Sequence, residues 1–389
     1  MAGHPYSLMR GGPTHRLLYH WRLIGPGTRA APWLCVLLVV LTFAPLAMYC
    51  ALDGTLWRRA GSVALLGDYA TLARFLLALP VLVLLAPRSD DFLRQAMRQF
   101  VHAALVAPSR QRLLSAELRR IRRLRDAALP ELLCLALAAA SVMLYGPGLG
   151  DRLPGMAQWT LRGDGQLSQA GAWLHYVSMP LFRFVLLAWL WRLLLWTLLL
   201  WKLARLRLDL HPAHPDGVAG LGFVGLAQER FAVLALANGL VLSGAFANDM
   251  IYLGTTLASL RHLLAGYLLG TSLLLLAPLL LLAPTLSRVK RHALLRYGEL
   301  GHQSAADFDH RWLHAPAAAH QGALLDAPDS SALADFTAVY ATVKAIPPLP
   351  LSRWTVLHVV LYAAVPLAPL PLLAFSVDEL AQRLFQLLA

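Results

Sequence analysis

The sequence predicts an all-α protein, a polytopic transmembrane helical bundle of about seven spans with small cytoplasmic helical segments. Of its 389 residues, 58% are hydrophobic and only 14% are charged, which is too apolar for a soluble chain of this length. Seven apolar stretches approach or exceed the roughly 17–25 residues that cross a hydrocarbon core of about 30 Å. Because none of them alternates like a strand, each is expected to be a helix.

The predicted spans divide the chain into six parts. The spans are 32–52, 63–86, 129–145, 176–201, 231–252, 263–286 and 354–375. The expected parts are a cytoplasmic N-terminal segment (1–31), two spans (32–86), a basic cytoplasmic helical segment (87–128), four spans with a His-Pro-Asp loop at 211–225 (129–286), a second cytoplasmic helical segment (287–353), and a Pro-rich span with an amphipathic C-terminal helix (354–389). The first span lacks a cleavage-site pattern, so we expect it to be retained.

The basic residues predict the orientation. With a cytoplasmic N-terminus, 24 of the 34 basic residues fall on the cytoplasmic side, six fall outside, and the other four lie in or at the edges of spans. Basic loops remain preferentially in the cytoplasm. Almost all of these residues are arginine, a bias typical of a GC-rich bacterial genome. We therefore expect a multi-pass protein of a bacterial inner membrane, and no nucleic-acid partner.

Two cytoplasmic segments have patterns of their own. The first carries an arginine-rich stretch, which is expected to form a juxtamembrane helix facing water and anionic headgroups: Arg119, Arg120, Arg122, Arg123 and Arg125. The second contains apolar residues at helical spacing, which predict one apolar helix face: Leu333, Phe336, Val339, Tyr340, Val343 and Ile346. A cytoplasmic protein partner on these segments is one expectation.

The His-Pro-Asp loop admits two interpretations. His211, His214 and Asp216 could surround a divalent ion with two imidazoles and a carboxylate. Alternatively, Asp216 caps the following helix and the nearby glycines allow a tight turn. The two prolines of the segment favour the turn, so no cofactor and no catalytic residue are assigned.

The same loop carries a resemblance. His214–Asp216 and Gly220–Phe223 resemble a pattern in an uncharacterised family of proteobacterial polytopic inner-membrane proteins. Later segments of that family are similar to Tyr297–Gly298, Asp307–Trp312 and Leu333–Asp335. The resemblance covers most of the chain and implies the same architecture, but it implies no activity.

Three arginines lie within the predicted spans. Arg74 and Arg183 are expected about two helical turns below the outer surface, and Arg192 nearer the membrane middle. An arginine at the bilayer centre costs about 2.5–3.5 kcal/mol on insertion scales, so Asp68 or Asp249 is expected to pair with at least one of them. Arg74 and Arg183, at matching depth, are the better candidates for lining a shared cavity that admits an anion.

Structural alternatives exist for these charges. Full pairing would make a buried ion network, and Arg192 shares a helix face with Trp189 and Trp196, which predicts a cation–π clamp. The leading functional hypothesis is nevertheless a channel or transporter for a small solute or ion. The alternatives are a membrane-embedded sensor or scaffold that binds a cytoplasmic partner, and a membrane enzyme that uses the His-Pro-Asp loop.

Two further patterns concern helix packing. Small residues recur along the fifth and sixth spans and predict close helix contacts, within the chain or in a homo-oligomer: Ala235, Gly239, Ser243, Ala247, Gly266 and Gly270. Three prolines predict an interrupted seventh span: Pro366, Pro369 and Pro371.

Overall fold

The computed structural model describes residues 7–8, 11–20, 30–57, 62–102, 105–144, 156–206, 208–314 and 328–374. It is 81% helical, which confirms the all-α class. Six of the described helices are long and apolar enough to cross a membrane, and a seventh candidate is the bent pair 108–126 and 128–144. The expected amphipathic C-terminal helix at 376–389 lies outside the described residues.

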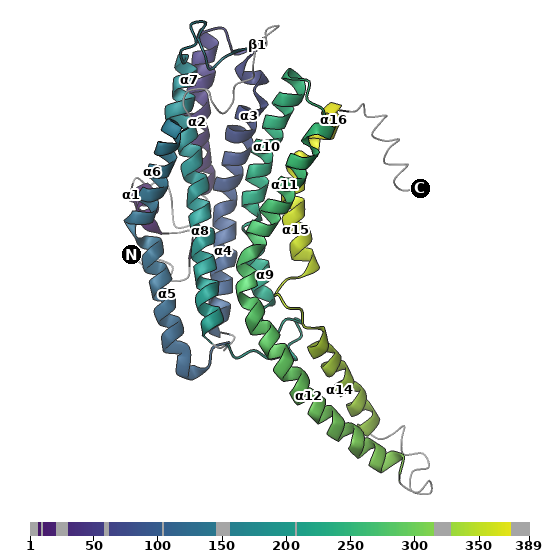
Figure 1. The fold of residues 1–389 in the computed structure, drawn as a ribbon. Helices are drawn as coiled ribbons and strands as arrows, with labels where there is room; N and C mark the ends of the chain where they lie inside the picture. Colours follow the sequence, from purple (N-terminus) through teal and green to yellow (C-terminus); the bar gives the residue numbers. More distant parts are fainter. Residues whose placement is uncertain are drawn as a thin grey trace.

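The first half of the chain builds one side of the bundle (Figure 1). Its main helices are α1 (Gly12–His20), α2 (Ala30–Leu52), α3 (Tyr69–Leu72), α4 (Leu79–His102), α5 (Gln111–Asp126) and α6 (Ala128–Leu144). A π-helical stretch, η2 (Ala73–Ala78), joins α3 to α4. Two short strands, β1 (Ser62–Val63) and β2 (Ala157–Gln158), pair in parallel at the end of the bundle opposite α5.

The rest of the chain contributes the remaining helices. They are α7 (Gln169–Trp173), α8 (Met179–Arg205), α9 (Gly222–Glu229), α10 (Ala232–Tyr252), α11 (Leu257–Leu276), α12 (Ala283–Trp312), α14 (Pro328–Ala345), α15 (Arg353–Ala364) and α16 (Pro369–Ala374). A π stretch, η4 (Leu174–Ser178), joins α7 to α8, and a 3-10 stretch, η5 (Ala277–Leu282), joins α11 to α12. The turn η7 (Val365–Leu367) separates α15 from α16, so the predicted interruption of the last span is confirmed.

Several helices continue well beyond their apolar stretches. The unit Gln169–Arg205 has 37 residues, about 55 Å at 1.5 Å per residue, whereas the hydrocarbon core is about 30 Å thick. Segment 87–102, expected to begin a separate cytoplasmic unit, is instead the continuation of α4. Helix α4 therefore continues past its apolar stretch at the end of the bundle that carries α5, which we call the basic end.

Helix α8 is most deeply buried in its second half. Trp189 and Trp196 are almost fully buried, and each indole N–H donates a hydrogen bond, to the carbonyl of Leu82 (3.1 Å) and to Oε1 of Gln228 (2.8 Å) respectively. In lipid, helices associate through van der Waals packing and such interhelical hydrogen bonds rather than through the hydrophobic effect. These tryptophans therefore tie α8 to α4 and α9.

The small-residue pattern has two different outcomes. A Cβ at Gly239 of α10 would lie 2.9 Å from Oη of Tyr267 and 3.1 Å from the carbonyl of Ala363, so this glycine permits the approach of α11 and α15. A Cβ at Gly266 or Gly270 would meet no atom within 4 Å. The predicted contact between helices through Gly266 is thus not made among the described residues, because that side of α11 faces outward; a subunit contact there stays a prediction.

An antiparallel helix pair projects from the basic end (Figure 1). We call it the arm: α12 from Arg288 to Trp312, together with α14. The rings of Tyr297 and Phe336 stack with centroids 6.4 Å apart, and Val343 and Ile346 are fully buried. These residues confirm that the predicted apolar face of 333–346 packs inward, although Val339 on the same face is 37% exposed.

Candidate functional site

Charged side chains from several helices meet where the bundle changes from apolar to polar. We call this group the charge layer, and it consists of Asp90 on α4, Arg125 and Asp126 on α5, Glu131 on α6 and Arg192 on α8. Asp90 is 0% exposed and Arg125 is 6% exposed. Arg192 is partly buried and is attracted electrostatically by Glu131 and Asp90.

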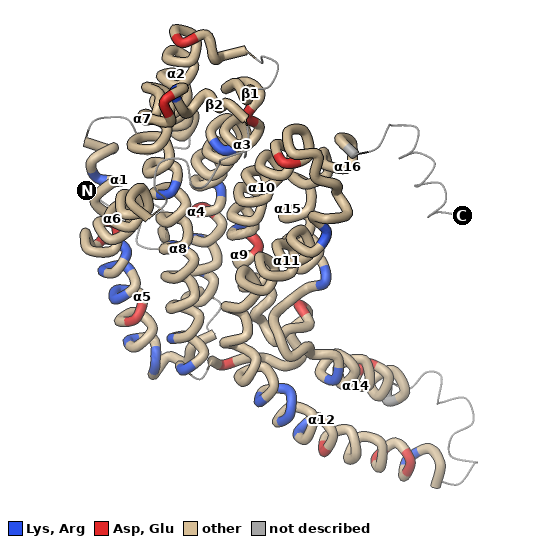
Figure 2. The backbone as a smooth tube through the Cα atoms, turned by 45° about the horizontal axis from the view of Figure 1, so that its top comes forward, with Lys and Arg blue, Asp and Glu red and all other residues tan. Residues whose placement is uncertain are grey.

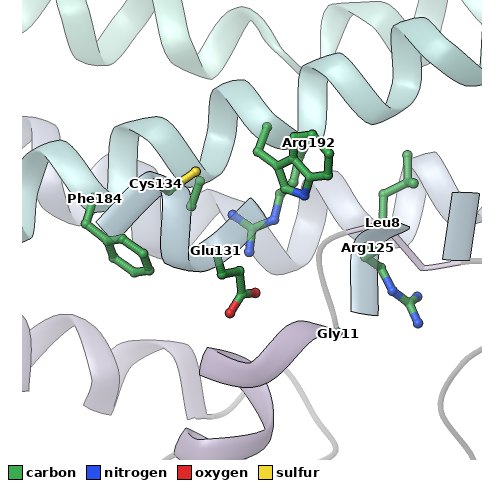
Figure 3. A pocket seen from close by; sticks show the side chains of 9 residues that line it. Leu8, Gly11, Arg125, Glu131, Cys134, Phe184 and Arg192 are labelled. Atoms are coloured by element: carbon green, nitrogen blue, oxygen red, sulfur yellow. The ribbon is translucent and has the colours of Figure 1, made fainter. Parts of the chain in front are cut away.

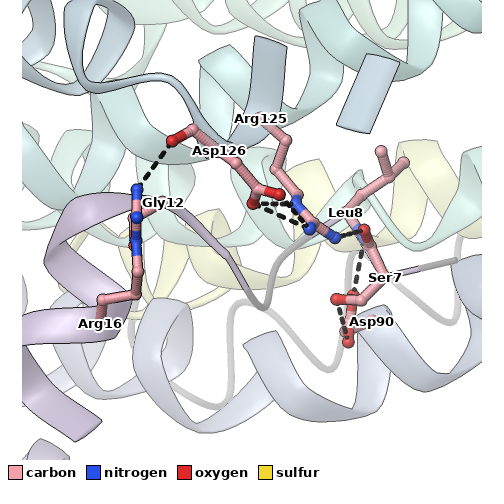
Figure 4. A network of polar contacts seen from close by, with 7 residues as sticks. All are labelled: Ser7, Leu8, Gly12, Arg16, Asp90, Arg125 and Asp126. Atoms are coloured by element: carbon pink, nitrogen blue, oxygen red, sulfur yellow. Dashed lines mark hydrogen bonds and ion pairs between the residues drawn. The ribbon is translucent and has the colours of Figure 1, made fainter. Parts of the chain in front are cut away.

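The N-terminal segment is bound to this layer (Figure 4). Oγ of Ser7 donates to the Asp90 carboxylate at 2.7 Å and 2.8 Å, and the backbone N–H of Leu8 donates to the same group at 3.1 Å. Nη1 of Arg125 donates to the carbonyl of Ser7. The N-terminal segment is therefore bonded to both α4 and α5, more than 80 positions further along the chain.

Two glycines allow the segment to lie so close. A Cβ at Gly11 would overlap the guanidinium of Arg125, and one at Gly12 would overlap the carboxylate of Glu131. Gly12 also has a φ of +88°, a conformation that side chains disfavour. From this point α1 begins, and the backbone N–H of Thr14 donates to Oε2 of Glu131 at 2.7 Å.

A small cavity of about 10 Å³ lies between this segment and α8, room for about one water molecule. Figure 3 shows Arg192 pointing toward the side of the cavity that holds Glu131. Cys134 and Trp191 also line it, and Nε1 of Trp191 is buried without a hydrogen-bond partner among the described residues.

Arg16 on α1 adds a third cation beside the charge layer, since its Nη2 donates to the carbonyl of Asp126 at 2.9 Å. Among the described residues, Arg16, Arg125 and Arg192 then stand against three carboxylates, those of Asp90, Asp126 and Glu131. The structure places Arg192 beside residues at which α4 and α6 become charged, and its depth in the membrane stays a prediction.

Arg74 and Arg183 lie toward the opposite end of the bundle. Their sequence neighbours Phe75 and Phe182 form an edge-to-face contact with ring centroids 6.3 Å apart, which agrees with the predicted matching depth. Arg74 is buried, whereas Nη1 of Arg183 donates to Oγ of Ser141 on α6 at 2.7 Å. A cavity shared by the two arginines stays a prediction.

Asp68 is held by four neutral donors. Its carboxylate accepts from the backbone N–H and Oγ1 of Thr71 (3.2 Å and 2.7 Å), from Nε1 of Trp159 (3.2 Å) and from Nδ2 of Asn248 (2.9 Å). A cavity of about 20 Å³ lies beside it. Asp249, the next residue on α10, is partly buried. Pairing of Asp68 or Asp249 with an arginine stays a prediction.

The His-Pro-Asp loop forms a tight turn before α9. Oδ1 of Asp216 accepts from the backbone N–H groups of Val218 (2.9 Å) and Gly220 (3.0 Å), and Oδ2 accepts from that of Gly222 (2.9 Å). Nδ1 of His214 lies 2.9 Å from Oδ1 of the same carboxylate. The structure thus supports the turn interpretation.

These contacts shift the pKa of Asp216. Partial burial raises the pKa of Asp216, but the N–H groups of Gly220, Gly222 and Val218, together with His214, outweigh it, so the pKa lies below its ordinary value. His211 is exposed. Among the described residues no three His, Cys, Asp or Glu side chains are grouped as a metal site would require.

Sequence reasoning missed a polar group at the start of α10. Nδ1 of His358 on α15 contacts Oε1 of Glu229, and the guanidinium of Arg230 lies 4.6 Å from the ring centroid of Phe92 on α4. Since Phe92 follows Asp90 by two residues, this group lies at nearly the depth of the charge layer. The polar triplet at 228–230, directly before an apolar run, was the available signal.

Comparison with known proteins identified no relative: no family model, curated protein or solved structure matches the chain.

Proposed function

We propose that the protein is a membrane-embedded scaffold or sensor that presents the arm to a soluble protein partner. The observation that carries this proposal is that the arm is braced beyond its base by its own two helices, while its base, at Ala293, Val343 and Ile346, is continuous with the core of the bundle. Its inner contacts are the Tyr297–Phe336 stack and the hydrogen bond from Nζ of Lys290 to the carbonyl of Ile346 (2.8 Å) at its base. A helix pair that contributes little to bundle packing is available for contacts outside it.

The composition of the arm supports a protein partner rather than lipid. Large apolar side chains are exposed on α12, with Leu295 at 74%, Leu300 at 50% and Leu313 at 71%. Charged residues such as Arg296 and Asp309 are interspersed among them, so this surface is suited to water rather than to hydrocarbon. Exposed leucines among charged residues are characteristic of a polar-rimmed protein contact.

Crosslinking in cells tests the scaffold proposal. A photoreactive amino acid at Leu295 or Leu300 should yield the same discrete protein adduct from both positions. The matched control is Leu269 of α11, which is 66% exposed on an apolar helix of the bundle and should contact lipid. Absence of an adduct at both arm positions, or the same adduct from Leu269, would contradict the proposal.

Transport of a small anion is the second candidate, favoured by the cavity beside Arg192. In the present arrangement the N-terminal segment covers this cavity, so permeation requires the segment to leave the charge layer. Flux of a panel of anions in proteoliposomes tests it, with Arg192→Gln, Arg74→Gln and Arg183→Gln as variants. Unchanged selectivity in folded variants, or no flux by the wild type, would eliminate this candidate.

The membrane location, the orientation and the family of the protein are also proposals. We infer from the basic-residue count that it belongs to a bacterial inner membrane with its N-terminus and arm in the cytoplasm, and from the His214–Asp216 motif that it belongs to the proteobacterial family that it resembles. Reporters fused after Arg125 and Arg296 should be cytoplasmic, and one fused after Gly165 periplasmic. The reverse pattern would contradict the orientation.

A further inference from the structure

Helix α5 has two opposite faces of different character. Leu114, Ile121 and Arg125 are buried against the bundle. The other arginines of its second half are exposed and form what we call the α5 arginine face: Arg119, Arg120, Arg122 and Arg123. At about 100° per residue, these four occupy an arc opposite the buried residues. Figure 2 shows basic residues along the outer side of α5.

The protein does not neutralise this face. Within the described residues, its four arginines have neither a hydrogen bond nor an ion pair, whereas two basic side chains nearby do. Arg125 binds Asp126 and Ser7, and Nζ of Lys202 lies 3.5 Å from Oε1 of Glu117. Since α5 carries six arginines against two carboxylates, its net charge is +4, which attracts an external anionic group.

The position of the face indicates what supplies that counter-charge. α5 bends by 41° into α6, and immediately after the bend Leu129 (77%), Leu132 (59%) and Leu133 (57%) are exposed. These leucines mark the beginning of a lipid-facing surface. Arg119 precedes the last residue of α5, Asp126, by seven positions, about 10 Å along the helix. The four arginines therefore lie at the depth of lipid phosphates, next to the hydrocarbon.

We propose that the α5 arginine face binds the phosphate groups of anionic phospholipids at the basic end. A guanidinium donates two parallel hydrogen bonds to phosphate oxygens, which favours arginine over lysine at such a site. Anionic leaflets attract basic segments near the membrane surface. The buried side of α5 holds the four guanidinium groups outward, so the lipid binds a preformed surface.

Lipid retention tests this proposal in the full-length protein. The wild-type protein is extracted from vesicles of phosphatidylglycerol and phosphatidylcholine in polymer-bounded lipid particles. The lipid retained around it should be enriched several-fold in phosphatidylglycerol relative to the vesicles. This enrichment should fall at high salt. Replacement of all four arginines by glutamine should abolish it. The matched control removes four exposed arginines from the arm, Arg288, Arg291, Arg296 and Arg311, and should leave the enrichment unchanged.

Other outcomes would overturn the proposal. Equal loss in the arm control would mean that only total charge matters. Competition by glycerol phosphate or inorganic phosphate at millimolar concentration would assign the face to a soluble anion, and salt-sensitive binding of RNA without lipid preference would assign it to a polyanion. If the quadruple variant does not fold, the pair Arg119→Gln and Arg123→Gln replaces it, and undiminished enrichment in that pair contradicts the proposal.

Discussion

The two ends of the bundle each bury a carboxylate, but they stabilise it by different means. Asp68 accepts four hydrogen bonds from Thr71, Trp159 and Asn248, all of which are neutral donors. Asp90 accepts from Ser7 and Leu8 and lies in a layer where Arg125 and Arg192 supply positive charge. One network is a set of dipoles around a single charge, and the other is a balanced set of ions.

The two networks hold different elements of the bundle together. The neutral donors around Asp68 come from α3, α10 and the loop after β2, so this carboxylate ties three elements together. The charge layer instead depends on cations, and it also binds the N-terminal segment through Ser7 and Leu8. A change of charge in the layer therefore alters the docking of that segment as well as stability.

The largest effect is expected for Arg125→Gln. The substitution removes the bond to Ser7 and leaves the carboxylates of the layer with one cation fewer, so we expect a loss of about 3–5 kcal/mol in the free energy of unfolding. Denaturant titration of purified protein in detergent measures it. Arg123→Gln, on the exposed side of the same helix, is the matched control and should remain within about 0.5 kcal/mol of wild type. Equal effects would refute the ionic description of the layer.

Asp68→Asn should be the next most damaging. The amide presents one accepting oxygen and one NH₂ group, and the latter would face two hydrogen-bond donors, at about 1–3 kcal/mol for each donor left unsatisfied. Asp249→Asn provides the control, since Asp249 is the adjacent residue to Asn248 but only partly buried. The same titration should show little change for it. Comparable losses in both variants would mean that the donors around Asp68 are not what stabilises this end.

Two glycine substitutions distinguish a packed helix contact from an exposed helix face. Gly239→Leu should destabilise the protein by about 1–3 kcal/mol, because added side-chain volume would force α11 and α15 away from α10. Gly266→Leu should have no such effect in a monomer, as its Cβ would meet open space. Yield of folded monodisperse protein and its thermal midpoint report both. A loss at Gly266 accompanied by a smaller particle size would instead support the predicted homo-oligomer.

The smallest effect is expected at Asp216. Because its folded-state pKa is lowered, the stabilisation that it provides is complete above the ordinary aspartate value of about 3.9 and is lost as the pH falls through the folded pKa. Asp216→Ala should cost about 0.5–2 kcal/mol at neutral pH, as for other capping residues, and should remove this acid dependence. Hydrogen exchange at 217–222 measures the change; unaltered protection at neutral pH would contradict the capping role.

Much of the fold follows from the sequence because lipid imposes few solutions. Apolar stretches of sufficient length must form helices, so the spans, the interruption at Pro366 and the apolar face of α14 were predictable. The common depth of Arg74 and Arg183 followed from residue counting along two helices. The lengths of α4 and α8 were not predictable in this way, because a helix continues into water as long as its neighbours pack against it.

The candidate site was much less predictable. Asp90 and Arg125 lie outside the predicted spans, so they gave no intramembrane signal. Glu131 lies at the start of the predicted span 129–145, but nothing in the sequence indicated its contact with the N-terminal segment, and Ser7 reaches Asp90 across 83 positions of sequence. The partner Asn248 of Asp68 is 180 positions away. Contacts between residues so far apart in the sequence depend on how the helices pack against one another, which hydropathy does not encode. Asp216 was the exception, because its partners follow it within six residues.

The most direct test of the scaffold proposal is removal of the arm. Replacing residues 299–340 by a short Gly-Ser linker deletes most of it while preserving Lys290 and Ile346 at its base. If the arm serves a partner and not the bundle, the shortened protein should be monodisperse in detergent with an unchanged midpoint of unfolding, and a photoreactive group at Leu295 should no longer yield the partner adduct. A bundle that unfolds without the arm, or an adduct that persists, would contradict the account.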